Sequence, residues 1–168
     1  QMGEQPSRVF DVGSLGVENI KAVPLMTKDE LEASLDFKID TQTILVTYHP
    51  VTLGGDFAKD IREFLDALDQ FKDLKVIFTM PNSDTGRDAI ALAVENYVEK
   101  HSNRAKAYTS LGLKRYLSTL QFVKAAVGNS SSGIIEVPSF GIPTLNIGDR
   151  QKGRLASKSV VNCGTSKD

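Results

Sequence analysis

Short apolar segments rich in β-branched residues alternate with amphipathic segments along most of this 168-residue chain. Thr43–Tyr48 (TILVTY) is nearly all apolar, which is typical of a strand buried on both faces of a sheet. Phe57–Phe71 follows it with apolar side chains at helical spacing. Because strands and helices alternate, the sequence predicts right-handed crossovers, and therefore an α/β fold with a mostly parallel sheet and helices on both faces.

The remaining segments continue this alternation. We expect further strands at Arg8–Val12, Leu74–Met80, Ala105–Thr109, Val123–Val127 and Pro143–Ile147, with one more beginning at Ser159–Asn162. We expect helices at Lys28–Leu35, Arg87–Lys100, Leu113–Leu120 and Ser131–Ser139. Thr27 is the predicted N-cap of the first of these helices, and Pro138 should kink or stop the last one because proline lacks an N–H. With no internal repeat and no long linker, residues 1–168 read as one domain.

Composition excludes several classes of protein. The chain has 20 basic and 21 acidic residues, a balance that argues against a general nucleic-acid binder. No apolar run approaches the roughly 20 residues of a membrane span, so we expect no membrane partner. One cysteine and two histidines argue against a structural zinc site, and we expect no metal. The lone Cys163 fits a reducing compartment, so we expect a cytoplasmic protein. Because Met is absent from position 1, we also expect a piece of a longer protein.

The small residues GNSSSG, at positions 128–133, lie between a predicted strand and a predicted helix. Small side chains allow a ligand to approach the backbone, and free N–H groups at a helix start favour an anion. The spacing is neither that of a P-loop nor that of the GxGxxG fingerprint. An ordinary serine N-cap is the simpler explanation, but one serine would be enough for a cap. Three serines in a row favour an anion site that includes Ser130 and Ser131.

Two charged residues extend this hypothesis. Glu136 lies about one turn into the same helix, where a carboxylate would repel phosphate but suit the hydroxyls of a ribose. Arg150 follows the next predicted strand and could clamp a phosphate. Lys152 and Arg154 follow it, and Lys152 in particular fits ordinary surface charge. Serines, a glutamate and an arginine together predict a site for a nucleoside diphosphate.

Two other strands end in residues that could contribute to such a site. His49 directly follows Thr43–Tyr48, where it could donate to a phosphate or move a proton, although a surface loop histidine is the alternative. Asn82 begins the segment NSDTG after Leu74–Met80. These residue types account for a turn and a helix cap without any ligand.

The sequence resembles the C-terminal half of the members of a known family, the UDP-N-acetylglucosamine 2-epimerases. The resemblance rests on GNSSSGIIEVPSFGIPTLNIGDRQKGR at 128–154, YHPVT at 48–52, VFDVGSLG at 9–16 and MPNSDTG at 80–86. It covers nearly the whole chain. The HPVT and GxRQxGR segments are closer to the hydrolysing branch, which serves sialic-acid and legionaminic-acid synthesis, than to the non-hydrolysing branch.

The resemblance implies a Rossmann-like three-layer α/β sandwich that forms one half of a two-domain GT-B enzyme. It implies that UDP or UDP-N-acetylglucosamine is the ligand and that no cofactor is required. Within the site it implies a role at the diphosphate for His49, which is thought to assist departure of UDP. It further implies UDP contacts for Ser130 and Ser131 at the diphosphate, Glu136 at the ribose, Arg150 near the phosphates, Asn82, and, on weaker grounds, Gly13 and Ser14.

The implied reaction is anti elimination of UDP to give 2-acetamidoglucal, followed by addition of water to give N-acetylmannosamine. Its base and acid are carboxylates of an N-terminal domain that this chain lacks, so we expect weak UDP binding at most and no turnover from the piece alone. The resemblance makes that domain a partner and a homodimer a candidate assembly. Three alternatives stay open: the donor domain of a GT-B glycosyltransferase, a non-hydrolysing epimerase, and a nucleotide-sensing or scaffold module.

Overall fold

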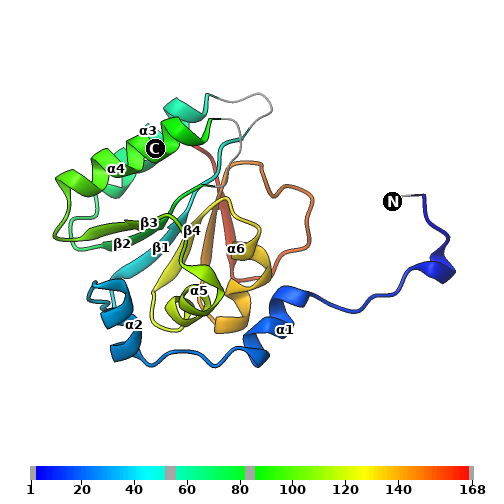
Figure 1. Cartoon of the computed structure of the whole chain (residues 1–168). Coiled ribbons are helices and arrows are strands. Elements are labelled where there is room, and N and C mark those ends of the chain that lie inside the picture. The colour runs from blue at the N-terminus through cyan, green and yellow to red at the C-terminus, as the bar shows by residue number, and fades with distance from the viewer. Residues whose placement is uncertain (1–2, 52–55, 82–85, 167–168) are drawn as a thin grey trace.

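A six-stranded sheet forms the centre of the molecule in the computed structural model, which describes residues 3–51, 56–81 and 86–166 (Figure 1). Every strand pair in it is parallel, and the order is β3-β2-β1-β4-β5-β6. The strands are β1 Thr43–Thr47, β2 Lys75–Thr79, β3 Ala105–Tyr108, β4 Ala125–Gly128, β5 Thr144–Ile147 and β6 Val160–Cys163. This is the order of the doubly wound Rossmann fold, whose direction of winding reverses between β1 and β4. The predicted α/β fold is confirmed, and each of these strands was expected within a few residues.

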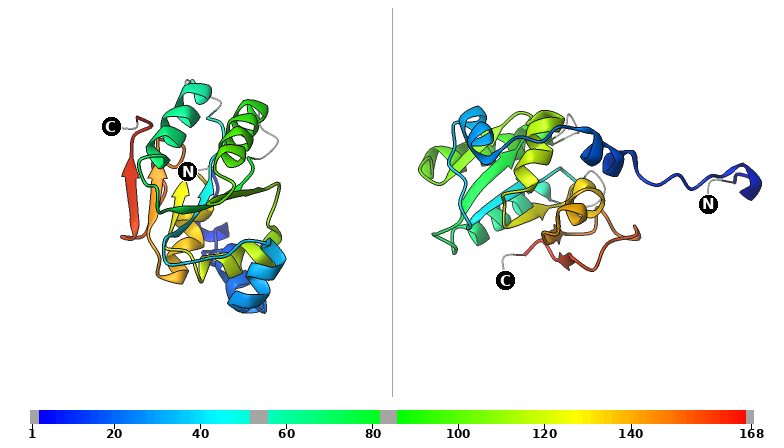
Figure 2. Two further views of the ribbon diagram at one scale, coloured as in Figure 1. Left: turned by 90° about the vertical axis from the view of Figure 1, so that its left-hand side faces the viewer. Right: turned by 90° about the horizontal axis from the view of Figure 1, so that it is seen from below.

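Helices cover both faces of the sheet (Figure 2). On one face, α3 (Phe57–Leu68) and α4 (Arg87–Lys100) pack against Ile44 and Val46 of β1. On the other face, a second cluster joins Leu45 to apolar side chains of three short elements, which are α2 (Lys28–Leu35), α5 (Gly112–Leu120) and the 3-10 helix η2 (Val137–Phe140). Successive side chains of a strand point to opposite faces, so β1 contributes to both halves of the core. This explains why its sequence is continuously apolar.

The predicted strand Arg8–Val12 is wrong. Pro6–Arg8 is a 3-10 helix, η1, and the residues after it form an extended arm that leads away from the body of the molecule (Figures 1 and 2). Val9, Phe10 and Val12 are all exposed, and no described strand pairs with them. β propensity alone does not make a strand when the backbone has no partner. The arm leads into α1 (Leu15–Ala22), a helix that the sequence analysis did not predict.

Local sequence signals account for the start of one helix and for the interruption of another. Thr27 and Glu30 form a capping box at the start of α2, where the Thr27 side chain accepts from the Glu30 N–H and the Glu30 carboxylate accepts from the Thr27 N–H. The helix expected at Ser131–Ser139 is instead divided into α6 (Ser132–Ile135) and η2. The break falls before Pro138, whose ring cannot follow a continuing helix.

Candidate functional site

A pocket of about 640 Å³ opens at the carboxyl ends of β1, β2, β3 and β4. This edge of the sheet contains the position where the winding reverses, at which open α/β sheets bind ligands. The described residues that line the pocket are Thr47, His49, Thr79, Met80, Pro81, Arg87, Thr109, Ser110, Leu111, Gly112, Leu113, Tyr116, Ser130, Ser131, Ser132 and Arg150. We call this the switch-point pocket.

The pocket brings together four residues that the sequence singled out, which are His49, Ser130, Ser131 and Arg150. Gly13, Ser14 and Glu136 are not among its lining residues. Gly13 is exposed on the arm, and Ser14 is the N-cap residue of α1. Asn82 lies outside the described residues. The predicted roles in ligand binding therefore remain predictions for every one of these residues.

The charges of the pocket are suited to an anion. Arg87 and Arg150 contribute guanidinium groups, and His49 contributes an imidazole. No aspartate or glutamate occurs among the lining residues that the structure describes. Arg87, at the start of α4, was not singled out from the sequence, although its place after a strand and a turn was available as a signal. A cluster of positive groups without carboxylates favours phosphate over a cationic ligand.

Hydroxyl groups form much of the remaining wall. The Thr47 and Thr79 hydroxyls lie 2.6 Å apart on neighbouring strands, and the Tyr116 hydroxyl bonds the Ser132 hydroxyl. Burial raises the pKa of Tyr116 to about 12, although a tyrosine hydroxyl is protonated at neutral pH even at its ordinary pKa of about 10. Ser131 is the N-cap residue of α6, yet its side chain makes no capping bond. The neighbouring Ser130 Oγ does accept from the Ser132 N–H over 3.4 Å, so one serine of the row bonds the start of α6 as the simpler explanation expects.

Asn129 connects the strand ends beneath the pocket, and the sequence analysis did not single it out. It is fully buried, its Oδ1 accepts from the His49 N–H over 2.7 Å, and its Nδ2 donates to the His49 carbonyl over 2.8 Å. Its own carbonyl accepts from Arg150 Nη1 over 3.1 Å and from Gln151 Nε2 over 2.7 Å. His49 itself is only 5% exposed, so the reading of it as a surface loop residue is wrong. One asparagine thus fixes both His49 and Arg150.

Gly128 and Gly133 allow the close packing that this arrangement requires. Gly128 has a φ of +135°, and a Cβ there would lie 2.7 Å from the Thr47 carbonyl carbon. A Cβ on Gly133 would lie 2.8 Å from Thr144 Cγ2, where α6 packs on β5. The Thr144 hydroxyl also donates to the Gly133 carbonyl over 2.6 Å. The glycines of GNSSSG therefore have packing reasons that are independent of any ligand.

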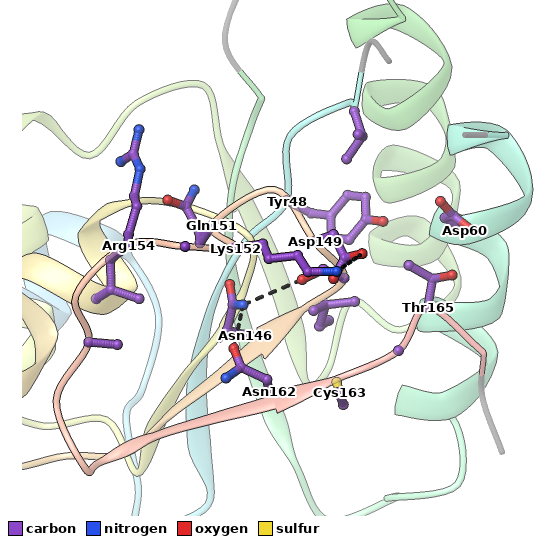
Figure 3. A pocket seen from close by; sticks show the side chains of 17 residues that line it. Tyr48, Asp60, Asn146, Asp149, Gln151, Lys152, Arg154, Asn162, Cys163 and Thr165 are labelled. Carbon is purple, nitrogen blue, oxygen red and sulfur yellow. Dashed lines mark hydrogen bonds and ion pairs between the residues drawn. The ribbon is translucent and has the colours of Figure 1, made fainter. Parts of the chain in front are cut away.

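A second pocket, of about 790 Å³, lies beyond Gln151 at the ends of β5 and β6 (Figure 3). Lys152 and Arg154 line this pocket and not the first one. Asn146 donates to Asn162 Oδ1 over 2.8 Å across the two strands. Arg150 and Gln151 are consecutive, bond the same carbonyl, and face different pockets. The basic cluster of the sequence is thereby divided, with only Arg150 at the switch-point pocket.

Within residues 3–51, 56–81 and 86–166, no group of three or more His, Cys, Asp or Glu side chains could hold a metal ion. No helix of the same residues has the length and apolar character required to cross a membrane.

The sequence profile of the UDP-N-acetylglucosamine 2-epimerase family matches residues 1–168. The chain belongs to this family. A "GDP/UDP-N,N'-diacetylbacillosamine 2-epimerase (hydrolyzing)" of Campylobacter jejuni is 43% identical to this 2-epimerase-family chain over 163 residues, covering 96% of it and 42% of the relative. "Polysialic acid biosynthesis protein P7" of Escherichia coli is 39% identical over 170 residues, covering 100% of the chain and 43% of the relative. The chain therefore spans less than half the length of these curated relatives.

Solved structures of 2-epimerases share the fold. The structure of Staphylococcus aureus MnaA with UDP superposes with a TM-score of 0.69 at 18% identity, covering 98% of this chain and 43% of that one. A 2-epimerase described as putative from Listeria monocytogenes gives 0.70 at 19% identity with the same coverage. A UDP-glucose:anthocyanidin 3-O-glucosyltransferase gives a lower score of 0.51. The Rossmann-like sandwich of this chain thus corresponds to about two fifths of a 2-epimerase chain.

Proposed function

We propose that this chain is the UDP-binding half of a hydrolysing 2-epimerase. The observation that carries the proposal is the switch-point pocket, which gathers two arginines, a histidine and a row of hydroxyls without a carboxylate among its described lining residues. A diphosphate matches this set of donors in charge and in hydrogen-bonding capacity. Membership of the 2-epimerase family makes a UDP-sugar the first candidate.

In this proposal the hydroxyls of Ser130 and Ser131 donate to the diphosphate. Arg150 donates to it with the guanidinium nitrogens that Asn129 does not use. Met80, Pro81, Leu111 and Leu113 form an apolar wall in the same pocket, which suits the face of a base. Glu136 lies outside this wall and would accept from the ribose hydroxyls.

The proposed reaction begins with removal of the C2 proton and cleavage of the C1–O bond to UDP on opposite faces of the sugar. The electron pair of the C2–H bond forms the C1–C2 double bond of 2-acetamidoglucal, and UDP leaves with the bonding pair of C1–O. Water then adds across the double bond to release N-acetylmannosamine. This chain would stabilise the negative charge that develops on UDP, with His49 donating to a phosphate oxygen. The proton-transferring carboxylates would come from a separate N-terminal domain, and a cytoplasmic location remains part of the proposal.

The names of the relatives favour a hydrolysing over a non-hydrolysing epimerase, and they suggest a second candidate substrate. Relatives of 43% and 30% identity are both named as hydrolysing epimerases of N,N'-diacetylbacillosamine nucleotides. UDP-N,N'-diacetylbacillosamine is therefore a second candidate beside UDP-N-acetylglucosamine. The sugar would project from the switch-point pocket toward the proposed second domain. This half would therefore determine the specificity for the nucleotide, and the other half the specificity for the sugar.

The test is to incubate the intact gene product with each UDP-sugar and to follow the products by NMR. We expect free UDP together with a free 2-epimerised sugar, from one of the two substrates. A 2-epimerised sugar that stays attached to UDP would identify a non-hydrolysing enzyme. Transfer of the intact sugar to an added acceptor would identify a glycosyltransferase. The 168-residue chain alone should yield none of these products.

A further inference from the structure

Glu136 lies against a glycine of helix α1, which follows the N-terminal arm. It is half-buried at the end of α6, while Gly16 is the second residue of α1. A Cβ built on Gly16 would lie 3.0 Å from Glu136 Cδ and closer still to Oε1. The three atoms nearest to that Cβ all belong to the Glu136 side chain. Residues 120 positions apart therefore meet where only a glycine leaves room for the carboxylate.

The position of Glu136 makes this contact matter. Its Oε2 is buried and has no hydrogen-bond partner within the described part of the chain. A buried carboxylate oxygen without a donor is unusual and favours a site that a ligand completes. The contact with α1 restricts where the other oxygen, Oε1, can lie. The carboxylate is thus held by packing, with one oxygen still to be satisfied.

The backbone conformation at position 16 does not require a glycine. Its φ lies outside the left-handed region, so any residue could adopt its conformation. Alanine is also the better helix former, by about 1 kcal/mol. The atoms that would move on substitution are the end of a flexible side chain and not backbone. Replacing Gly16 should therefore leave the fold intact and displace the carboxylate.

We propose that Gly16 is a positioning residue that holds the Glu136 carboxylate in place for the vicinal hydroxyls of a nucleotide ribose. This inference rests on the proposed function, because it assigns a ribose to Glu136. It adds to the nucleotide site a residue that neither the family match nor the lining of the switch-point pocket indicates. The first turn of α1 becomes part of the nucleotide site through a residue that touches no ligand.

The experiment measures the affinities of the intact gene product for UDP and for 2′,3′-dideoxy-UDP, by calorimetry. The variants are Gly16→Ala, Glu136→Ala and the double variant. The matched control is Gly164→Ala, since a Cβ on Gly164 meets nothing within 4 Å and its φ is not left-handed. Circular dichroism and thermal melting of each variant check that the fold is unchanged.

We expect the wild type to prefer UDP by about tenfold or more, as hydrogen bonds to a charged group would give. Gly16→Ala should lose most of that preference while its affinity for the dideoxy compound stays within about twofold. Glu136→Ala should behave alike, and adding Gly16→Ala to it should change nothing further. If Gly16 had only a structural role, Gly16→Ala would instead lower the affinities for UDP and for the dideoxy compound equally.

Three results would overturn the inference, in distinguishable ways. If the wild type prefers UDP and Gly16→Ala keeps the preference, Gly16 has no positioning role, and the proposed function stands. If the wild type binds neither nucleotide, or binds both equally, the assignment of ribose to Glu136 fails and the role of Gly16 fails with it. An additive effect of Gly16→Ala in the Glu136→Ala background would also contradict the inference.

Discussion

The side-chain amide of Asn129 forms two hydrogen bonds with the backbone of His49, one through each of its polar atoms. This pair joins the ends of β4 and β1, the two strands between which the winding of the sheet reverses. Because the Asn129 carbonyl also accepts from Arg150 and Gln151, the same residue orients both sides of the switch-point pocket. A fully buried polar residue with every polar group bonded is a rigid support for the groups around it.

Replacing Asn129 should therefore affect stability as well as the site. Asn129→Ala removes both side-chain hydrogen bonds to the buried backbone of His49, and we expect a loss of about 3 kcal/mol in the free energy of unfolding. Urea denaturation measures this loss. Asn103→Ala is the control, because Asn103 is exposed, and it should change stability by less than about 0.5 kcal/mol. A similar result for both variants would contradict the role given to Asn129.

Gly128→Ala should be among the most destabilising single substitutions in the chain. The new Cβ would lie 2.7 Å from the Thr47 carbonyl carbon, at a φ of +135° that alanine rarely adopts. We expect a loss of roughly 3 kcal/mol or more, measured by thermal melting or seen as loss of soluble protein. Gly164→Ala adds the same methyl group in open space and should melt like the wild type. A stable Gly128→Ala protein would show that β1 and β4 can separate at this point.

Arg150 should bind phosphate and not nucleoside. We expect Arg150→Met to weaken UDP binding by about 10- to 100-fold, through loss of charge-assisted hydrogen bonds, and to leave uridine binding unchanged. Arg154→Met removes the same charge four residues later, from an exposed side chain that lines the other pocket. That variant should bind UDP like the wild type. Equal losses in the two variants would mean that only net charge matters.

Stability should fall in acid partly through Glu32. Its carboxylate accepts from Lys38 Nζ over 2.6 Å and from the Ile39 N–H over 2.9 Å. These bonds, the one from Lys38 above all, lower the pKa of Glu32 below its usual value of 4.5. A lowered folded-state pKa gives stability that is present above the unfolded pKa and is lost as pH falls through the folded one.

Glu32→Gln should consequently be less stable than the wild type at pH 7, and the difference should shrink below about pH 4. Urea denaturation at pH 7 and pH 3 measures both ends of this range. Glu99→Gln, at an exposed position, should follow the wild type at each pH. A difference that persists unchanged in acid would assign the effect of Glu32 to packing.

The sequence predicted the sheet well because its signals are local. Thr43–Tyr48 and Leu74–Met80 are short apolar runs between helical patterns, and that alternation determines a parallel sheet. The ends of three predicted strands, Thr43–Tyr48, Val123–Val127 and Pro143–Ile147, also indicated His49, Ser130, Ser131 and Arg150 as neighbours, and the switch-point pocket contains all four. Strand ends converge in such a fold wherever they lie in the chain.

What the sequence did not reveal depends on contacts between distant residues. Arg8–Val12 has the composition of a strand, but a strand needs a partner, and the described chain offers none. Asn129 looked like one more small polar residue of a loop, and only the path of β1 beside β4 gives it His49 to bond. Arg87 reaches the pocket through the placement of α4. The approach of Gly16 to Glu136 likewise depends on how α1 packs, for which no sequence pattern exists.

The most direct test of the account is a calorimetric titration of the intact gene product with UDP, with ADP as the control. The switch-point pocket should bind UDP at least about tenfold more tightly than ADP, and Ser131→Ala should weaken UDP binding by about tenfold. Equal affinities for the two nucleotides would mean that the pocket recognises only a diphosphate. No binding of UDP by the intact protein would contradict the central claim that this half of the enzyme holds the nucleotide.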